Sequence, residues 1–310
     1  MPNSLPSESP VARLLIVDGH SYAYRAFFAI RSLSSPTGQA TNAIYGFIRM
    51  LGKVLARVQP THVFVAWDGG LAEERMTLLP QYKAQRVEMP QDLAQQLGQI
   101  VTYLEAIRVY SFLKDACEAD DCIAALTRQA TEAGMEVVIA SSDKDFMQLV
   151  SPLVKLLNPH EKSDTLFGVE EVKRKTGVEA TQIVDWLSLI GDSVDNIPGV
   201  PGIGPKTATD LLLQFGTLDN LYSRLFEVGS VRLRTSLEAA KEVVRRNQQL
   251  VRLKEEVACD VSLQELVLKQ SDDELLRRLF SGWGFKTMLQ ELEQTRLKPV
   301  ELFHEKAVAG

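Results

Sequence analysis

Three short apolar runs in this sequence each lead into an aspartate. The runs occupy residues 14–17, 63–66 and 137–140, and the aspartates that follow are Asp18, Asp68 and Asp143. Such runs are typical of buried parallel strands. In an open parallel sheet, ligands bind beyond the carboxyl ends of the strands, so the three carboxylates are expected to meet in one crevice. A single aspartate after a strand is an ordinary turn residue, but three together favour a shared site.

A second group of acids opens a helical pattern that runs to residue 133. Glu118, Asp120 and Asp121 lie within four consecutive residues. Acids in a first helical turn are ordinary capping and dipole partners. Three of them exceed what capping requires, and they would repel one another unless cations lie nearby.

Two later loops bring the number of candidate metal ligands to nine. Asp145 follows Asp143 closely, and Asp192 and Asp195 lie three residues apart, on one face if that turn is helical. The nine acids are Asp18, Asp68, Glu118, Asp120, Asp121, Asp143, Asp145, Asp192 and Asp195. Their hard oxygen atoms suit Mg²⁺ or Mn²⁺. Nine exceed what one ion needs, so we expect two ions about 4 Å apart, the usual arrangement for cutting phosphodiesters.

A turn rich in Gly and Pro, residues 199–204, precedes another predicted helix. Glycines let backbone N–H groups approach a phosphate, and a helix N-terminus favours the anion. A nucleotide-binding P-loop is disfavoured, because Pro205 separates Gly204 from Lys206. We expect a hairpin that binds a DNA backbone without reading its sequence. A tight connection between two helices is the alternative.

Basic residues fall in two groups. Arg75, Lys83 and Arg86 follow Asp68, and Tyr82 beside them could stack an unpaired base or could serve only in packing. The second group could bind DNA or could be a solvated helix face, and it consists of Arg232, Arg234, Lys241, Arg245, Arg246, Arg252 and Lys254.

Helical periods alternate with the apolar runs in the first half of the chain. They cover residues 42–57 and 92–107, and strands alternating with helices indicate an α/β fold with a mostly parallel sheet. After about residue 165 no convincing strand remains, and helical stretches cover 169–177, 180–190, 205–215, 233–253 and 272–280. We therefore predict an all-helical C-terminal lobe. The expected division is a tail at 1–10, an α/β core at 11–165, the helical lobe at 166–296 and a tail at 297–310.

Composition limits the function classes. The 310 residues are 45% hydrophobic and 24% charged, as in ordinary soluble proteins. No apolar run approaches the ~20 residues that cross a bilayer, and residues 1–10 lack the apolar segment of a signal peptide. Cys117, Cys122 and Cys259 are a sparse, odd set that suits a reducing cytoplasm and disfavours a zinc site. A net charge of −6 is compatible with a nucleic-acid partner if the acids are concentrated in one pocket.

The order of these motifs resembles the 5′ nuclease family, which includes the N-terminal domain of bacterial DNA polymerase I, phage 5′ nucleases and flap endonucleases. The resemblance runs from about residue 14 to about residue 292. It rests on residues 17–19, 24–25, 45–47, 67–68, 81–86, 118–121, 142–145, 191–196 and 201–208. It implies a PIN-like or resolvase-like core and a structure-specific 5′–3′ exonuclease or 5′-flap endonuclease that acts on DNA in replication and repair.

The resemblance also implies roles for individual residues. Asp18, Asp68, Glu118 and Asp120 look like one metal cluster of the family, and Asp121, Asp143, Asp145, Asp192 and Asp195 look like the other. Lys83 resembles the lysine that assists at the scissile phosphate, with Arg86 as its basic neighbour and Asp68 as a third catalytic residue. The expected DNA contacts are Arg25, Arg75, Tyr82, Lys83, Arg86, Gly202, Gly204, Lys206 and Thr207.

Two segments correspond to DNA-binding elements of that family. Residues 69–90 correspond to a helical arch through which a single-stranded 5′ end threads, and residues 185–220 correspond to a helix–hairpin–helix that holds duplex DNA and a K⁺ ion. The arch departs from the family pattern at Glu73, Glu74 and Pro80. Because proline disfavours a continuous helix, we expect a kinked arch or one that is ordered only on DNA.

Two other functions share some of these features. A PIN-like RNase has a metal–carboxylate α/β core, but such enzymes are usually half this length and lack the hairpin lobe. A non-catalytic module that binds branched DNA would not need nine retained acids. Family analogy implies a monomer with no membrane partner. No polymerase domain follows, so we expect either a free-standing nuclease or a fragment of a larger protein.

Overall fold

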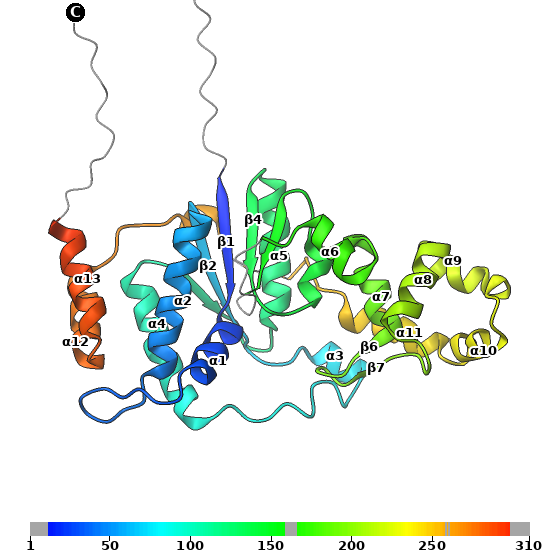
Figure 1. Cartoon of the computed structure of the whole chain (residues 1–310), viewed down its shortest axis with the longest axis horizontal. Coiled ribbons are helices and arrows are strands. Elements are labelled where there is room, and N and C mark those ends of the chain that lie inside the picture. The colour runs from blue at the N-terminus through cyan, green and yellow to red at the C-terminus, as the bar shows by residue number, and fades with distance from the viewer. Residues whose placement is uncertain (1–11, 159–165, 258, 260, 298–310) are drawn as a thin grey trace, which may run out of the picture.

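A five-stranded parallel sheet forms the centre of the molecule. The computed structural model describes residues 12–158, 166–257, 259 and 261–297. The strands lie in the order β3-β2-β1-β4-β5 (Figure 1). They are β1 Arg13–Asp18, β2 His62–Trp67, β3 Tyr110–Leu113, β4 Glu136–Ala140 and β5 Val154–Leu157. The register pairs Asp18 with Ala66 and Val17 with Ala140, so the three central strands end at the same edge. The predicted α/β class and parallel sheet are confirmed.

Alternating side chains of the sheet contact helices on its two faces. Leu15 and Val17 pack against three helices on one face, whereas Leu14 and Ile16 pack against one helix and the neighbouring lobe on the other. The three helices are α1 Gly19–Ala29, α2 Asn42–Val58 and α4 Gln91–Ala106, and the single one is α5 Ala119–Glu132. Both faces are therefore apolar, which is why the central strands are continuous apolar runs.

A helical lobe lies to the side of the sheet, beyond β4 and α5 (Figure 1). Its α-helices are α6 Val169–Thr176, α7 Ile183–Ile190, α8 Pro205–Phe215, α9 Leu218–Ser223, α10 Val231–Ala239 and α11 Lys241–Val251. Single 3₁₀ turns occur at η1 Asp145–Leu149, η2 Ala180–Gln182, η3 Leu225–Glu227 and η4 Leu263–Leu266. Two differences from expectation occur here. The helix expected at 233–253 is interrupted at Ala240, and a two-stranded antiparallel pair, β6 Gly191–Asp192 with β7 Ile197–Pro198, lies where no strand was expected.

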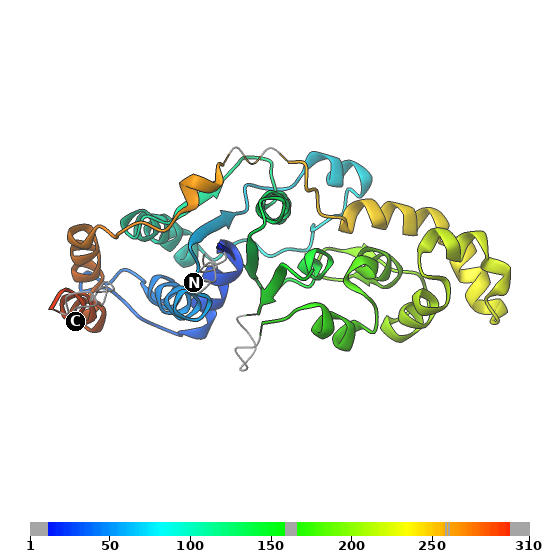
Figure 2. The same ribbon diagram turned by 90° about the horizontal axis from the view of Figure 1, so that it is seen from above.

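The last two helices return to the α/β body, at the opposite end of the molecule from the lobe (Figure 2). They are α12 Asp273–Trp283 and α13 Lys286–Leu297. Phe280 and Trp283 are buried in the same core as Tyr103 of α4. The expected lobe boundaries, 166–296, are therefore wrong at the C-terminal end. Helical periodicity identified the first of these helices but carries no information about which body it packs against.

Residues 69–90 do not form one continuous helix. The segment contains α3 Glu73–Leu78, which ends two residues before Pro80, and a series of turns follows. Figure 1 shows the chain running from α3, near β6 and β7, back to α4. The interruption expected from Pro80 is therefore present. None of the helices in the described ranges is long and apolar enough to span a bilayer.

Candidate active site

The carboxyl edge of the sheet brings Asp18 and Asp143 together through Ser141. The Ser141 hydroxyl donates to Asp18 Oδ2 at 2.8 Å and accepts from the Asp143 backbone N–H at 3.1 Å. The other Asp18 oxygen accepts from Ser21 N at 3.0 Å, so Asp18 also caps α1. Burial raises the pKa of Asp18, and the negative charges of Asp143 and Asp68 raise it further, so the three strand-end aspartates share one electrostatic environment. Ser141 therefore joins Asp18 to Asp143 at this edge, and the charge of Asp68 acts on the same carboxylate.

A second group of acids lies where the helical lobe meets this edge. Asp145, Asp192 and Asp195 offer carboxylate oxygens that lie within 4.8 Å of one another. The β6–β7 pair positions two of them, and it depends on glycine, because a Cβ on Gly199 would lie 2.2 Å from the Ile190 carbonyl oxygen. Asp145 Oδ1 is buried and has no hydrogen-bond partner among the described residues. A buried oxygen without a partner is costly unless a ligand completes it.

Burial and mutual repulsion raise the pKa values of several of these acids. Burial raises the pKa of Asp18 to about 6 and raises those of Asp120, Asp143 and Asp145. Asp143 further raises the pKa of Asp120 and of Asp145. Such a cluster of hard oxygen donors fits a divalent cation, because a cation offsets both the repulsion and the loss of hydration. The donor set and the unpartnered Asp145 oxygen therefore fit the expected metal.

Two cations of the 69–90 segment contact these acids. Lys83 is buried with φ +55°, and its ammonium contacts Glu118 Oε2 and lies 3.8 Å from Asp195 Oδ2. Arg86 Nη2 donates to Asp195 Oδ1 at 2.9 Å, and its Nη1 lies 3.9 Å from Asp68 Oδ2. Burial alone would raise the pKa of Glu118, but the charges of Lys83 and then Arg75 lower it overall. The expected catalytic residues Asp68, Lys83 and Arg86 thus border one cluster.

The turns after α3 are bound to the loop between β6 and β7. The backbone N–H of Lys83 donates to the Asp195 carbonyl at 3.0 Å, and Asn196 Nδ2 donates to the Gln81 carbonyl at 2.8 Å. The Gln85 amide contacts the Ser193 carbonyl. The segment that the sequence assigns to the arch is therefore held against the second group of acids.

Three expected site residues have other surroundings than the sequence suggested. Asp121 forms a two-bond ion pair with Arg75, with oxygen–nitrogen distances of 2.7 and 2.8 Å, rather than lying with Asp145 and Asp192. Arg75 is 2% exposed, so this structure does not present it to DNA. Tyr82 is 3% exposed and its hydroxyl donates to Glu118 at 3.1 Å, so here it packs rather than stacks a base. Spacing alone could not reveal these contacts, because each joins residues more than 35 positions apart.

His20 is a residue that the sequence reasoning missed. Its Nδ1 accepts from the Asp68 backbone N–H at 3.0 Å, and its ring lies edge-on to Trp67 at 5.4 Å. Burial lowers its pKa, which favours the neutral ring that this contact requires. The only available signal was its position two residues after Asp18, in the first turn of the helix that Asp18 caps.

The predicted hairpin is exposed at the N-terminus of α8. Gly202 adopts φ +83°, and a Cβ at Gly202 or Gly204 would meet nothing within 4 Å. Lys206 is exposed and Thr207 is partly exposed, while Ile203 and Ala208 are buried beneath them. Open backbone beside a helix N-terminus can accept a phosphate.

The remaining basic residues have mixed surroundings. Arg25, partly exposed on α1, lines a hollow with Tyr24, Phe28 and Ser142. In the group after the hairpin, Arg234 donates to the carbonyls of Phe226 and Val228. Lys254 pairs with Glu74, and Arg245 pairs with Glu242. At least these three cations therefore have structural partners of their own.

Comparison with known proteins identifies the family. Residues 13–177 match the family described as 5′-3′ exonuclease, N-terminal resolvase-like domain, and residues 178–274 match the 5′-3′ exonuclease, C-terminal SAM fold. The chain belongs to the 5′-3′ exonuclease family. The resemblance inferred from its motifs is confirmed.

Relatives in the 5′-3′ exonuclease family differ in length. The chain is 36% identical over 281 residues to the "5′-3′ exonuclease" of Aquifex aeolicus, covering 91% of this chain and 95% of that protein. It is 38% identical over 262 residues to "Flap endonuclease Xni" of Shewanella pealeana, covering 84% and 99%. It is 37% identical over 283 residues to "DNA polymerase I" of Bacillus caldotenax, covering 91% of this chain but 32% of that protein. The chain thus spans about a third of the length of its DNA polymerase I relatives.

Solved structures show the fold of this exonuclease family member. The T5 D15 protein co-crystallized with metal ions has a TM-score of 0.63 at 22% identity, covering 92% of this chain and 98% of that one. The catalytic core of Rad2 in complex with DNA substrate has a TM-score of 0.61 at 18% identity, covering 93% of each chain. The α/β body and helical lobe together are therefore an arrangement that other proteins share.

Two thiols flank the acids at the start of α5 in this exonuclease family member. Cys117 and Cys122 lie on either side of residues 118–121, and their sulfur atoms are 3.2 Å apart. Their mutual hydrogen bond and burial raise the pKa of the Cys117 thiol, and Asp121 raises it further. The hydrogen bond with Cys117 lowers the pKa of Cys122, but a hydrogen bond with Cys259 and burial raise it overall to about 12, so both thiols are protonated at neutral pH.

Proposed function

We propose that this chain is a divalent-metal-dependent 5′–3′ exodeoxyribonuclease and 5′-flap endonuclease that hydrolyses phosphodiester bonds with two metal ions. The observation that carries the proposal is the convergence of eight buried or partly buried carboxylates, bordered by Lys83 and Arg86, at one edge of the sheet. Family membership supports the activity, and the unpartnered Asp145 oxygen supports a bound cation.

We assign the metal positions by the grouping of the acids. Asp145, Asp192 and Asp195 would hold one ion. The other ion would bind among Asp18, Asp68, Glu118, Asp120 and Asp143. Mg²⁺ is the proposed ion, since it keeps several waters and needs few direct carboxylates. Bound there, it would polarise the phosphate and lower the pKa of an attacking water.

The protein's own side chains would orient the substrate. Lys83 and Arg86 lie beside acids of both groups, so a phosphate that approaches the acids also approaches their positive charges. The hairpin at the start of α8 would bind the backbone of a duplex, and a K⁺ ion there would add a positive charge. These contacts would hold the phosphodiester bond in place without recognising the DNA sequence.

The proposed substrates are DNA with 5′ flaps, nicks or gaps, including an RNA primer on DNA. A T5 D15 flap endonuclease structure described as a pseudo-enzyme-product complex with DNA and metal ions, at 21% identity, is compatible with this proposal. We further propose a monomer in a bacterial cytoplasm, acting in primer or flap removal during replication and repair.

A cleavage assay distinguishes this function from its two alternatives. A 5′-flap DNA, its RNA counterpart and an intact duplex are each incubated with Mg²⁺, with Mn²⁺ and with EDTA. We expect cutting near the flap junction that needs a metal. Cutting of RNA only would show a PIN-like RNase instead, and tight binding of the flap without cutting in any metal would show a binding module.

A further inference from the structure

Arg75 is buried at a point where three parts of the molecule meet. It comes from α3, it contacts acids at the start of α5, and it contacts the chain at the end of α11. Arginine has five N–H donors. Arg75 also has five acceptors. Nε donates to the Leu250 carbonyl at 3.1 Å. Nη1 lies 2.7 Å from Asp121 Oδ2 and 3.0 Å from Glu118 Oε1, and Nη2 lies 2.8 Å from Asp121 Oδ1 and 3.3 Å from the Arg252 carbonyl oxygen.

We propose that Arg75 and Asp121 form a positioning pair that orients Glu118 for the metal site, and that Asp121 is not itself a metal ligand. This inference rests on the proposed metal-dependent function. It departs from what the sequence suggested for both residues, namely a DNA contact for Arg75 and a metal ligand for Asp121.

The oxygens of Asp121 are already occupied. Oδ2 accepts from Arg75, and Oδ1 accepts from both Arg75 and the Lys254 backbone N–H at 3.0 Å. Bidentate hydrogen bonds between charged groups are short and directional. Removing one partner of a buried pair is destabilising, because the other is left as an unpaired buried charge. Asp121 is therefore bound to Arg75 through both of its carboxylate oxygens.

The oxygens of Glu118 are divided between two cations. Arg75 binds Oε1, whereas Lys83 and the Tyr82 hydroxyl contact Oε2. Lys83 also lies near Asp195, so Oε2 is the oxygen on the side of the other acids. With Arg75 removed, only the long contact of 3.4 Å from the Ala72 backbone N–H would still hold Oε1, and the carboxylate could turn away from the metal position.

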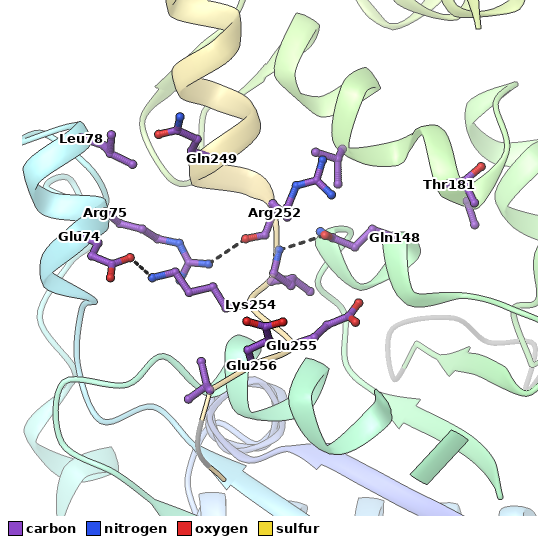
Figure 3. Close-up of a pocket in the computed structure, with 14 residues that line it drawn as sticks. Glu74, Arg75, Leu78, Gln148, Thr181, Gln249, Arg252, Lys254, Glu255 and Glu256 are labelled. Carbon is purple, nitrogen blue, oxygen red and sulfur yellow. Dashed lines mark hydrogen bonds and ion pairs between the residues drawn. The ribbon is translucent and has the colours of Figure 1, made fainter. Parts of the chain in front are cut away.

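The contacts to α11 connect this pair to the helical lobe. The Leu250 carbonyl belongs to the last turn of α11, and a cation beside that helix end is favourable. Figure 3 shows Arg75 extending across to Arg252 and Lys254 extending to Glu74. A cavity of about 930 Å³ lies beside these residues and is lined by Leu78, Gln148 and Thr181 among others. A small cation can therefore approach the Arg75 position from solvent.

The test compares metal and DNA affinities of the full chain. Mn²⁺ binding to the DNA-free protein is measured by calorimetry, and flap DNA binding is measured in EDTA. We expect Arg75→Gln to weaken Mn²⁺ binding at least tenfold and to change DNA affinity less than twofold. Thr181→Ala, in the lining of the same cavity, is the matched control and should change neither. Arg75→Lys keeps the positive charge but not the bidentate geometry, so it should lose Mn²⁺ affinity to the same extent. It replaces Arg75→Gln in the test if that variant does not fold.

Asp121→Asn and the double variant separate positioning from ligation. Residues that act as one unit are non-additive, so the double variant Arg75→Gln/Asp121→Asn should bind Mn²⁺ no more weakly than either single variant. In Arg75→Ala, millimolar guanidinium should restore Mn²⁺ affinity by occupying the vacated position, and it should leave Asp121→Asn unchanged.

Three outcomes would overturn the inference. The first is that Arg75→Gln loses DNA affinity but keeps normal Mn²⁺ affinity. The second is that Asp121→Asn loses far more Mn²⁺ affinity than Arg75→Gln does. The third is that the losses of Mn²⁺ affinity in the two single variants add up in the double variant. Failure of the proposed function is distinguishable, because the unaltered chain would then neither bind Mn²⁺ nor cut the flap.

Discussion

Repulsion among buried carboxylates is the main feature of this molecule at the scale of single residues. Asp18 has a pKa of about 6 in the fold, against 3.8 for an ordinary aspartate, and burial is the largest cause. Between these values the folded chain binds more protons than the unfolded chain. Its stability therefore falls as pH rises through this range.

This proton linkage predicts how stability depends on pH without metal. In EDTA, the melting temperature should be higher near pH 5 than near pH 8, with Asp18 contributing on the order of 1.4 kcal/mol over that interval. Added Mn²⁺ should stabilise the protein more at pH 8, because the ionised acids bind it. Thermal melts of the unaltered chain and of Asp18→Asn check this, and the variant should show the weaker pH dependence. A melting temperature that rises from pH 5 to pH 8 in EDTA would contradict it.

Asp68 offers a test of catalysis apart from DNA binding. Its side chain is 29% exposed, and its main partner is the Gly70 backbone N–H at 3.1 Å, so Asp68→Asn should fold normally. We expect single-turnover cleavage of a flap to fall by at least a thousandfold. DNA affinity in EDTA should stay the same or increase, since a negative charge is lost near the phosphate. Unchanged turnover would remove Asp68 from the site.

Much of the site could be predicted from residue types and spacing, and the exceptions have a common cause. Asp18 and Asp143 were predictable because strand ends align in a parallel sheet. Asp121 looked the same in sequence as Asp120, since adjacent residues of a first helical turn differ only in which way they point. That direction is decided by Arg75, 46 positions away, and no local pattern contains it.

At the scale of elements, the length of a strand and the continuity of its apolar residues determined whether the sequence could predict it. β1, β2 and β4 were predicted because each is a continuous apolar run. β3 and β5 have four residues each, and β3 is only half-buried, so neither gives a clear pattern. β6 and β7 exist because two glycines allow close approach of backbones, which hydropathy does not register.

The hairpin before α8 gives a prediction at this scale. Lys206→Ala should weaken binding of flap DNA uniformly across sequences and reduce the slope of log affinity against log salt by about 1, because one phosphate contact is lost. Lys173→Ala on α6 is the matched control, since that lysine pairs with Glu179. Equal slopes for both variants, measured by anisotropy titration at several salt concentrations, would count against the hairpin as a DNA contact.

At the scale of the whole molecule, the chain leaves the α/β body, forms the lobe and returns. The return places Phe280 and Trp283 of α12 in the core beside α4, where they are 6% exposed. The C-terminal helices therefore contribute to the stability of the α/β body, although they follow the lobe in sequence.

Removing one of these aromatic side chains should destabilise the entire α/β body. Phe280→Ala should lower the free energy of unfolding by about 3–5 kcal/mol, the range for a buried aromatic side chain. Leu213→Ala is a control for side-chain removal, since Leu213 is 65% exposed on α8. Urea unfolding monitored by fluorescence and by circular dichroism gives both values. A cost below about 1 kcal/mol for Phe280→Ala would show that the helices are dispensable.

The sulfur atoms beside the start of α5 affect the choice of metals for spectroscopy. Hard ions such as Mn²⁺ prefer oxygen, whereas softer ions such as Cd²⁺ also prefer thiolates. Cys117 and Cys122 adjoin Glu118 and Asp121, so a cadmium titration would report sulfur and oxygen ligation at once. Paramagnetic manganese, or cadmium with a Cys117→Ser/Cys122→Ser chain, would report the carboxylates alone.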